Sequence, residues 1–360
     1  MRVKLEDVCE RGSSNIKQSD IIKMSGNYPI YGASGLAGKV NFYHQEQPYV
    51  AVVKDGAGIG RTTLNPAKSS VIGTMQYLIP KKNVLPEYLF YVVSYMHLEK
   101  YYTGATIPHI YFKDYKNEEF NLDNIEKQLE IIDVLGRCKK VIEARKQELV
   151  ELDSLTKARF VELFGDPRSN PFGFEKKRLK DTCKVITGNT PLRAIAEYYG
   201  DYIEWIKTDN IVSGILNPTQ ATESLSEKGM NVGRTVEKDS ILMACIAGSI
   251  ASIGRVCITD RTVAFNQQIN AVVPEQYNIL FLYVLFQMSK DYLVEDINMA
   301  LKGILSKSKL EEKEFIIPPM DLQEQFSDFV KQVNKSKVAV QKALDETQIL
   351  FDSLMQKYFG

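Results

Sequence analysis

The side chains that most often carry acid–base, nucleophilic or metal chemistry are few and unevenly placed in this sequence. Its three histidines, His44, His97 and His109, lack metal-ligand spacing, and none occurs after the first third of the chain. Acid or base catalysis elsewhere would need carboxylates, which do not pair recognisably. The five cysteines, at positions 9, 138, 183, 245 and 257, form neither a disulfide framework nor a paired zinc pattern. The sequence therefore predicts no catalytic histidine shared by both halves of the chain and no zinc site.

Two glycine-rich loops come close to nucleotide-binding motifs without matching them. In Tyr31-Gly-Ala-Ser-Gly-Leu-Ala-Gly-Lys39, the first glycine is one residue too far from the Gly-Lys pair, and Val40 replaces the magnesium-binding hydroxyl of a P-loop. Gly56-Ala-Gly-Ile-Gly60 lacks the spacing of a dinucleotide loop, and no Asn-Pro-Pro-aromatic tetrad of an amino-methyltransferase is present. We expect these glycines to form tight turns that present the side chains of Lys39, Lys54 and Arg61.

The elements that would position these side chains occur twice in the chain. Leu5 and Cys9 correspond to Leu179 and Cys183 at an offset of 174, whereas Arg61 corresponds to Arg255 at 194, so the second copy carries about twenty extra residues early. The later correspondences are Phe120 with Phe315 at 195, Gln128 with Gln325 at 197, Leu152-Asp-Ser-Leu155 with Phe351-Asp-Ser-Leu354 at 199, and Phe164-Gly165 with Phe359-Gly360 at 195. The same order with different content predicts two similar units that recognise two different things.

Each copy begins with a unit of mixed α/β character. Short β-branched runs predict strands at 49–53, 76–79, 240–245, 255–258 and 269–273. An aromatic helix is expected after them in each copy, at 87–102 and at 278–294. We interpret the aromatic side chains on one side of these helices as core rather than as a stacking platform.

A long heptad-patterned helix closes each copy. The first has Asp123 as its expected N-cap and Glu126 three residues later; the second follows Pro318-Pro319, with Asp321 as its expected cap. Each pattern predicts a helix of roughly 35 to 40 residues, on the order of 50 to 60 Å long. The apolar seams are expected at Ile131, Leu135, Cys138, Ile142, Arg145, Leu149, Leu152 and Thr156, and at Leu322, Phe326, Phe329, Val333, Ser336, Val340, Ala343, Thr347, Leu350 and Leu354.

A single apolar seam on a helix of this length needs a partner. One alternative is packing of each helix against its own globular unit or in a homodimer. The other is an antiparallel pair formed by the two helices of one chain, which also gives the duplication a use. The predicted fold class is α+β, with two mixed α/β units, two long helices forming an antiparallel coiled coil and an internal pseudo-twofold repeat. The predicted divisions are 1–120, 121–165, 166–317 and 318–360.

Composition limits the partners of the chain. The 45 basic and 45 acidic residues cancel, so contact with a polyanion would depend on local patches of lysine and arginine. No secretory signal opens the sequence, and its most apolar window, 241–253, is too short to cross about 30 Å of hydrocarbon. We therefore expect no membrane association and, with scattered cysteines, a location in the reducing cytoplasm.

Four segments make the sequence resemble the DNA specificity subunit of Type I restriction-modification systems. They are the linker Leu152-Asp-Ser-Leu-Thr-Lys-Ala-Arg-Phe-Val-Glu-Leu-Phe-Gly-Asp-Pro167, Arg178-Leu-Lys-Asp-Thr-Cys-Lys-Val-Ile-Thr-Gly-Asn-Thr-Pro191, Pro318-Pro-Met-Asp-Leu-Gln-Glu-Gln325, and the ending Phe351-Asp-Ser-Leu-Met-Gln-Lys-Tyr-Phe-Gly360. The resemblance extends over the whole chain, and it is specific in the linker and helices but loose in the globular units.

The resemblance implies two target recognition domains, each reading one half of a bipartite site in double-stranded DNA. The paired helices would set the gap and dock methyltransferase subunits, with restriction/translocase subunits as further partners. The chain itself would be non-catalytic and bind no cofactor, because S-adenosylmethionine, ATP and magnesium are expected on partner subunits. The helix residues implied in docking or in the coiled coil are Leu135, Ile142, Leu149, Leu152, Phe326, Phe329, Val333, Val340 and Leu350.

Basic and amide side chains supply the candidate DNA contacts. Lysine and arginine neutralise phosphates, whereas glutamine and arginine can read base edges. The candidates are Lys39, Lys54, Arg61, Lys68 and Gln76 in the first unit, and Lys207, Arg234, Arg255, Gln267, Gln268, Lys302 and Lys307 in the second. Arg61 and Arg255 hold the same repeat position, which a shared turn would also explain. The alternatives are a small-molecule-binding enzyme and a scaffold of a multisubunit complex that does not touch DNA.

Overall fold

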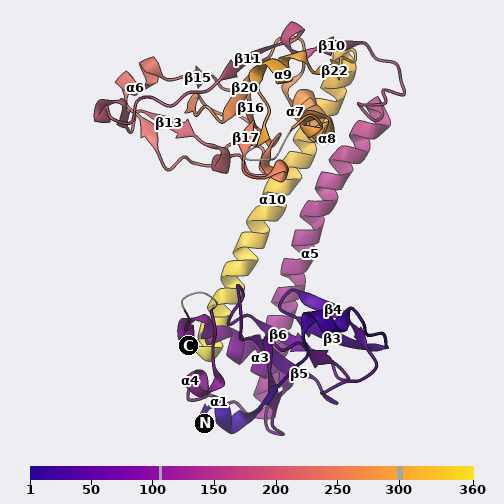
Figure 1. Ribbon diagram of the computed structural model, residues 1–360, viewed down its shortest axis with the longest axis vertical. Coiled ribbons are helices and arrows are strands. Elements are labelled where there is room, and N and C mark those ends of the chain that lie inside the picture. The colour runs from indigo at the N-terminus through magenta and orange to yellow at the C-terminus, as the bar shows by residue number, and fades with distance from the viewer. Residues whose placement is uncertain (105–107, 298–302) are drawn as a thin grey trace. The chain divides into compact units, whose positions relative to one another are not determined.

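The computed structural model describes residues 1–104, 108–297 and 303–360 (Figure 1). The chain divides into two compact units. Unit 1 consists of Met1–Lys146 and Lys342–Gly360, and unit 2 of Gln147–Gln341. Both units mix sheets and helices, and each contains one end of each long helix. In the described part of the chain no helix is long and apolar enough to span a bilayer.

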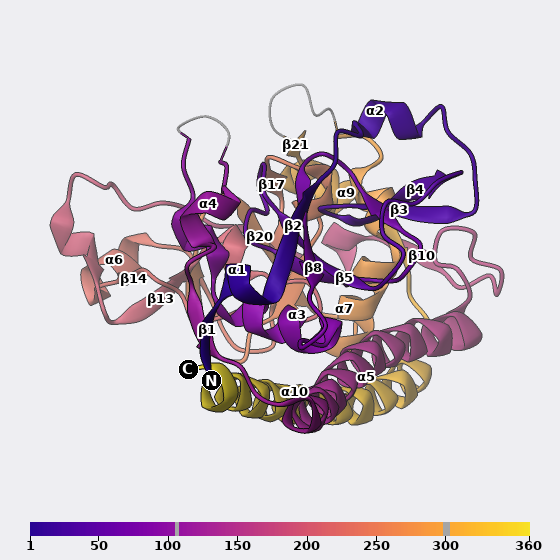
Figure 2. The ribbon, with the colours of Figure 1, turned by 90° about the horizontal axis from the view of Figure 1, so that it is seen from below.

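A four-stranded antiparallel sheet forms the centre of unit 1, in the order β2-β8-β5-β6. Its strands are β2 Cys9–Ser13, β8 Met75–Pro80, β5 Tyr49–Val53 and β6 Thr62–Asn65. Every residue of β5 is buried, as its run of valines predicts. Helix α3, Pro86–Tyr95, packs on β5, β6 and β8 through Tyr88, Leu89 and Val92 (Figure 2).

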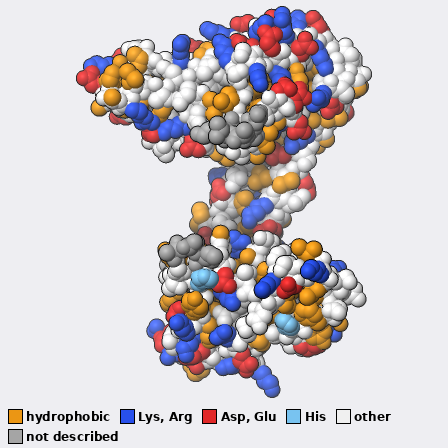
Figure 3. Space-filling view, viewed as in Figure 1, with side chains coloured by type: hydrophobic (Ala, Val, Ile, Leu, Met, Phe, Trp, Pro, Cys, Tyr) orange, Lys and Arg blue, Asp and Glu red, His pale blue; other side chains and the backbone are white. Residues whose placement is uncertain are grey.

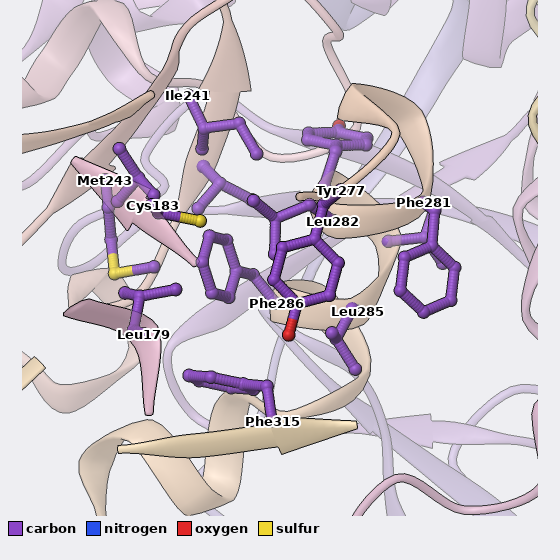
Figure 4. Packing of buried hydrophobic residues seen from close by; sticks show 14 of the residues in the cluster. Leu179, Cys183, Ile241, Met243, Tyr277, Phe281, Leu282, Leu285, Phe286 and Phe315 are labelled. Carbon is purple, nitrogen blue, oxygen red and sulfur yellow. The ribbon is translucent and has the colours of Figure 1, made fainter. Parts of the chain in front are cut away.

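Unit 2 repeats this sheet strand for strand, in the order β11-β20-β16-β18. The strands are β11 Cys183–Thr187, β20 Ile269–Pro274, β16 Ile241–Ala244 and β18 Val256–Ile258. Helix α7, Ile279–Met288, takes the place of α3. Its Phe281, Leu282 and Leu285 pack with Leu179, Ile241 and Phe315 in the core shown in Figure 4. The aromatic side chains of both helices are therefore core residues, as expected.

The aromatic helices are shorter than the sequence predicts. Helix α3 ends at Tyr95 because His97 adopts a left-handed conformation with φ of 51°. A 3-10 turn, η1 Leu98–Tyr101, follows it. In unit 2 the predicted helix divides at Ser289 into α7 and α8, Lys290–Val294.

A second sheet flanks the central one in each unit, and here the units differ. In unit 1 it has three strands, β4-β3-β7, with bounds Gly35–Val40, Tyr28–Gly32 and Ser70–Val71. In unit 2 it has five, β12-β14-β13-β19-β15, with bounds Tyr199–Gly200, Ser224–Leu225, Ile203–Ile206, Val263–Phe265 and Thr235–Val236. Both contain one parallel pair, β3 with β7 and β13 with β19, so the extra residues enlarge a common plan.

Short elements complete the two units. In unit 1 they are β1 Arg2–Lys4 paired with β9 Glu119–Asn121, and helices α1 Leu5–Val8, α2 Gln18–Ile21 and α4 Phe112–Tyr115. In unit 2 the strand pairs are β10 Lys176–Arg178 with β22 Glu314–Ile316, and β17 Ile246–Ala247 with β21 Gly303–Ile304. Its short helices are η2 Leu179–Asp181, η3 Ala196–Tyr198, η4 Thr208–Asn210, α6 Glu227–Val232, η5 Ile250–Ser252 and α9 Lys307–Glu312.

The two long helices, α5 Ile125–Phe164 and α10 Met320–Phe359, have 40 residues each. Within unit 2 they run antiparallel, because Phe160 near the end of α5 meets Phe326 near the start of α10, whereas Asp153 bonds to Lys337 at 2.7 Å. In unit 1, Met355 of α10 packs in one cluster with Ile131 and Leu135 of α5. The antiparallel pairing expected from the heptads is therefore present.

The apolar seam of α5 consists of the residues that its heptad pattern predicts. In α10, two of the predicted seam positions are wrong by one residue. Ser336 is exposed and Leu350 is 51% exposed, so their expected places in the seam are wrong. The side chains that face inward instead are those of Val330, Lys337 and Phe351. They are spaced by seven and fourteen residues, which keeps them on one side of the helix. Of the remaining predicted helix residues, Leu135, Ile142, Phe326, Val333 and Val340 are buried, and Leu149, Leu152 and Phe329 are half-buried.

The helices also correct the alignment of the repeats. Gln128 bonds its amide oxygen to the N–H of Leu85 at 2.9 Å, and Gln323 bonds in the same way to Asn278 at 3.0 Å. The equivalent of Gln128 is therefore Gln323, at an offset of 195, and not the exposed Gln325. The Leu-Asp-Ser-Leu match at 199 is four residues out of register. A shift of four residues keeps the same helix face, so the motif alone could not reveal it.

The predicted N-caps are each displaced. The side chain of Asn124, not Asp123, accepts the bond from the N–H of Lys127 at 2.9 Å. Asp123 accepts a bond from the hydroxyl of Tyr88 at 3.0 Å. Helix α10 begins at Met320, which places Asp321 inside the first turn, where its charge still favours the helix N-terminus.

Candidate DNA interface

An arginine joins the two sheets at the same place in both units. The guanidinium of Arg61 donates to the carbonyl oxygen of Ala33 at 3.1 Å, directly after β3. The guanidinium of Arg255 donates to the carbonyl oxygen of Thr208 at 3.3 Å, shortly after the equivalent strand β13. Both arginines therefore hold the end of a parallel strand against the turn of the central sheet. Their shared repeat position has a structural explanation.

The turn that carries each arginine is also the same in both units. Gly60 and Gly254 adopt φ of 80° and 75°, a region that favours glycine. The N–H of Gly60 bonds to the carbonyl of Val53, and that of Gly254 to Ala244, at 2.9 and 2.8 Å. The expectation of a tight turn is confirmed for Gly60, whereas Gly38 and Lys39 of the other predicted loop lie in strand β4.

A pocket of about 260 Å³ opens beside this turn in unit 1. The cations at its edge are Arg11, Lys54 and Lys113. Asp55 bonds to the ring of His109 at 2.6 Å, and that ring stacks on exposed Tyr111. The pocket thus combines positive charge, hydrogen-bonding groups and an accessible aromatic ring, which are the side chains that contact phosphates and bases.

The equivalent place in unit 2 carries different side chains. Strand pairing sets Thr187 against Asn270 as it sets Ser13 against Gln76 in unit 1. The hydroxyl of Thr187 donates to Asn270 at 2.8 Å, and the amide of Asn270 donates to the sulfur of Cys245 at 3.3 Å. Cys245, which is buried, stands where unit 1 has Lys54. The same backbone therefore carries a pocket with cations at its edge in one unit, and hydrogen bonds from Thr187 to Asn270 and from Asn270 to Cys245 in the other.

Gln76, one of the candidate DNA contacts, is a buried side chain rather than an exposed one. Gln76 lies in β8, between two neighbouring strands, and is 4% exposed. Its amide oxygen accepts a bond from the hydroxyl of Tyr115 at 2.7 Å, so it supports the floor of the pocket. Lys302 falls outside the described residues.

The other candidates divide into exposed and held side chains. Lys39, Lys68 and Arg234 are exposed, and Gln267, also exposed, accepts a hydrogen bond from the hydroxyl of Thr190. Lys54 lies 3.8 Å from Asp55, Lys307 lies 3.5 Å from Glu311, and Lys207 bonds to Glu223. Gln268 accepts a bond from Asn266 at 3.2 Å. The structure brings Lys54 to the pocket edge but leaves Lys39 and Lys68 away from its lining, so the candidates do not form one cluster.

Sequence reasoning missed several side chains at these surfaces. Arg11, Tyr111 and Lys113 complete the pocket in unit 1. In unit 2 the guanidinium of Arg193 lies over the rings of Tyr199 and Trp205, at 4.6 and 4.9 Å, and pairs with Glu223 at 2.7 Å. The single tryptophan beside basic residues was an available signal for this second surface.

Charge is mixed rather than gathered on the visible face of the molecule. Figure 3 shows lysine and arginine side chains scattered among acidic ones over both units. This distribution agrees with the balanced composition, and it means that phosphate contacts would come from separate small groups of cations.

Four of the five cysteine side chains are buried. Burial raises the pKa of Cys9, Cys183, Cys245 and Cys257 to about 12, so these thiols are protonated at neutral pH. Among the described residues no group of three or more histidine, cysteine or acidic side chains could hold a metal ion.

Comparison with known proteins identifies relatives over most of the chain. The family model of the Type I restriction modification DNA specificity domain matches residues 1–153 and 171–347. The specificity subunit of the Type I restriction enzyme HindI from Haemophilus influenzae is 34% identical over 117 residues, covering 32% of this chain and 24% of that protein. That of MjaIX from Methanocaldococcus jannaschii is 25% identical over 307 residues, covering 78% of this chain and 69% of that protein.

Two solved structures share the fold. The S subunit of a Type I restriction-modification system from M. genitalium has a TM-score of 0.64 at 14% identity, covering 100% of this chain and 96% of that one. A chain from a study of complex assembly and conformational transition of a Type I system has a TM-score of 0.57 at 15% identity, covering 99% and 97%. The relatives are named as specificity subunits, so the expectation of a non-catalytic subunit holds. The chain belongs to the Type I restriction modification DNA specificity domain family.

Proposed function

We propose that each unit of this chain reads one half of a bipartite site in double-stranded DNA, as part of a Type I restriction-modification complex. The observation that carries this proposal is the repeat itself. One two-sheet frame occurs twice, and the side chains at its equivalent positions differ in kind, as Lys54 and Cys245 do. Two units with the same two-sheet arrangement but different side chains are suited to bind two different DNA half-sites.

The exposed cations support contact with the DNA backbone. Lys39, Lys68 and Arg234 are exposed and take part in no ion pair among the described residues, so they are available to phosphates. The pocket in unit 1 and the Arg193–Trp205 surface in unit 2 offer groups that can reach base edges. Base contacts by different side chains in the two units would give two unrelated half-sites.

The paired helices would act as a spacer and as the docking surface for methyltransferase subunits, with restriction/translocase subunits joining the complex. S-adenosylmethionine, ATP and magnesium would then be held by those partners. Exposed apolar side chains along α5 and α10, including Val141, Val150, Val338 and Ile349, suit a helix-docking role. A cytoplasmic location follows from a role on cellular DNA.

DNA binding measured across a salt series tests the proposal. The full chain with its methyltransferase subunits should bind duplex DNA with an affinity that falls steeply as salt rises, because phosphate contacts release counterions. The chain alone should bind more weakly, since its net charge is zero. Binding of the assembled complex that ignores salt, or no binding at all, would favour a scaffold without a DNA-reading role.

A further inference from the structure

The pocket of unit 1 contains a buried amide whose hydrogen-bond donor has no partner. Gln76 of β8 is 4% exposed and is one of the residues that line this pocket. Its amide oxygen accepts a bond from the hydroxyl of Tyr115, which is itself fully buried, at 2.7 Å. Among the described residues no group accepts a bond from the amide nitrogen of Gln76. Because a buried donor is costly to leave unpaired, the pocket is the place where an acceptor would bind.

The equivalent amide in unit 2 has partners at both ends. Asn270 takes the place of Gln76 in the strand pairing. Its oxygen accepts a bond from the hydroxyl of Thr187 at 2.8 Å, and its nitrogen donates to the sulfur of Cys245 at 3.3 Å. In unit 1, Lys54 stands at the position of Cys245, so a cation replaces the acceptor. The unpaired amide is therefore particular to unit 1 and is not a property of the shared sheet.

Most of the other polar side chains that line the pocket are cations. Arg11 and Lys113 are exposed, and neither takes part in an ion pair within the described part of the chain. One carboxylate, that of Asp55, also lines the pocket. It already bonds to the ring of His109 at 2.6 Å and lies 3.8 Å from the ammonium of Lys54. The pocket therefore has an excess of donors and of positive charge, which favours a negatively charged ligand that only accepts hydrogen bonds.

We propose that this pocket binds one phosphate group of the DNA backbone, with a non-bridging oxygen accepting the unpaired N–H of Gln76. Arg11 and Lys113 would pair with the same phosphate from the edge of the pocket. A phosphate is an acceptor-only anion on the outside of the duplex, so it matches a concave site with donors at its floor and edge. The edge of a base lies inside a groove of the duplex and is less able to reach a buried amide.

This inference rests on the proposed reading of DNA by unit 1, and it adds which part of the DNA the floor of the pocket holds. Phosphate contacts fix the register and orientation of a protein on the duplex but carry no sequence information directly. The pocket would therefore position unit 1 on its half-site. The exposed ring of Tyr111, at the edge of the pocket, would remain available to a neighbouring base or sugar.

DNA binding by the full chain with its methyltransferase subunits tests the proposal, on a duplex that carries the motif methylated in cells. Gln76→Glu keeps an acceptor for Tyr115 but replaces the unpaired donor by a carboxylate, which repels a phosphate. We expect about tenfold weaker binding, with an unchanged melting temperature and an unchanged methylated motif. Gln18→Glu adds the same charge at an exposed place in the same unit, outside the pocket lining, and should bind as the wild type does.

Two results of this assay would overturn the inference. Wild-type affinity of Gln76→Glu would mean that water alone occupies the pocket. A change in the methylated motif would mean that Gln76 reads a base.

Duplexes in which one phosphate at a time is replaced by a neutral methylphosphonate identify the group that Gln76 contacts. One position in the half-site of unit 1 should weaken binding of the wild-type complex. On that duplex alone, Gln76→Glu should bind within about twofold of the wild type, because the carboxylate has no charge to repel and the two changes are coupled. If Gln76→Glu weakens binding equally on every substituted duplex, no phosphate occupies the pocket.

The two exposed cations give a second test that leaves the buried amide intact. Arg11→Gln and Lys113→Gln together should reduce the slope of the logarithm of the binding constant against the logarithm of the salt concentration by about 0.9, the value for one phosphate. A reduction of about 1.8 would assign them to two separate phosphates, and an unchanged slope to none; both results contradict the inference. Failure of the wild-type complex to bind its motif at all would instead refute the proposed function.

Discussion

The central sheets of the two units share strand order, pairing and a glycine turn, yet their edges are finished differently. In unit 2, Leu216 and Asn217 form hydrogen bonds with Ile258, and the buried Cys245 accepts a hydrogen bond from Asn270. In unit 1, Leu64 of β6 stands at the position of Ile258 and is 38% exposed, and Lys54 lies at the edge of the pocket. The buried residues of the two central sheets thus specify the same strand arrangement, while residues at the sheet edges make different contacts in the two units.

The extra residues of unit 2 have two separate effects. They enlarge the second sheet from three strands to five, and they supply the segment that covers the edge of the first. The sequence places this insertion at about residues 189 to 220, where we expect the identity of the second half-site to reside.

The largest difference in stability between equivalent substitutions in the two units should come from the places where the two long helices pack against each other. Phe326 is fully buried among Phe160, Phe164 and Phe281, whereas unit 1 has Ile131 at the equivalent place. Phe326→Ala should cost about 3–5 kcal/mol of stability in unit 2. Fluorescence of the single tryptophan, Trp205, reports this unit during urea unfolding. Ile131→Ala should shift that signal far less, and an equal shift would show that the units unfold together.

The paired glutamines should matter next, and equally in the two units. Gln128→Ala leaves the N–H of Leu85 without its partner, and Gln323→Ala does the same to Asn278. Each change should cost about 1–3 kcal/mol of stability, because a part-buried N–H donor loses its acceptor. Circular dichroism during urea unfolding measures both. Gln325→Ala is the matched control at an exposed position and should stay within about 0.5 kcal/mol of the wild type.

Substitutions of the exposed cations should change the salt dependence of DNA binding, whereas substitutions of Arg61 and Arg255 should not. In a plot of the logarithm of the binding constant against the logarithm of the salt concentration, Lys39→Ala and Arg234→Ala should each reduce the slope by about 0.9. This is the value expected for the loss of one phosphate contact. Arg61→Ala and Arg255→Ala should instead reduce stability by about 1 kcal/mol and leave that slope unchanged, since their guanidinium groups hold main-chain carbonyls. A fall in slope for the two arginines would make them phosphate contacts after all.

The smallest effect concerns the thiols. With a pKa of about 12, Cys9, Cys183, Cys245 and Cys257 carry almost no thiolate at pH 8, and they are also buried. Half-buried Cys138 should therefore react first with a maleimide in the native chain. Mass spectrometry of the labelled peptides measures the order, and early labelling of Cys245 would mean that the contact with Asn270 opens.

The sequence was most informative where periodicity and burial coincide. The repeat, the β5 strand and the heptad of α5 were predictable because each depends on local pattern. Leu350 was misplaced because Phe351 beside it is equally apolar, and the stripe of α10 is decided by which side chain meets α5. The burial of Gln76 was not predicted, because Tyr115, which supplies its hydrogen bond, is distant in the sequence.

The sheet edges and the pocket of unit 1 could not be predicted, because both depend on contacts between segments that are distant in the sequence. Nothing local to Leu64 or Ile258 indicates that one edge is open and the other covered, because the covering segment lies about forty residues away in the chain. The same holds for Arg11 and Lys113, which line one pocket although they lie far apart in the sequence.

The central claim is that each unit reads its own half-site within a pseudo-twofold frame. Its most direct test is a chimera in which residues 2–121 replace residues 176–316, so that unit 1 occurs twice between the same helices. Methylome sequencing of cells that carry this chimera with its partner subunits should show a bipartite motif whose two halves are inverted copies of one half-site. A chimera that methylates the wild-type motif unchanged, or an active wild-type complex with a single uninterrupted motif, would contradict the account.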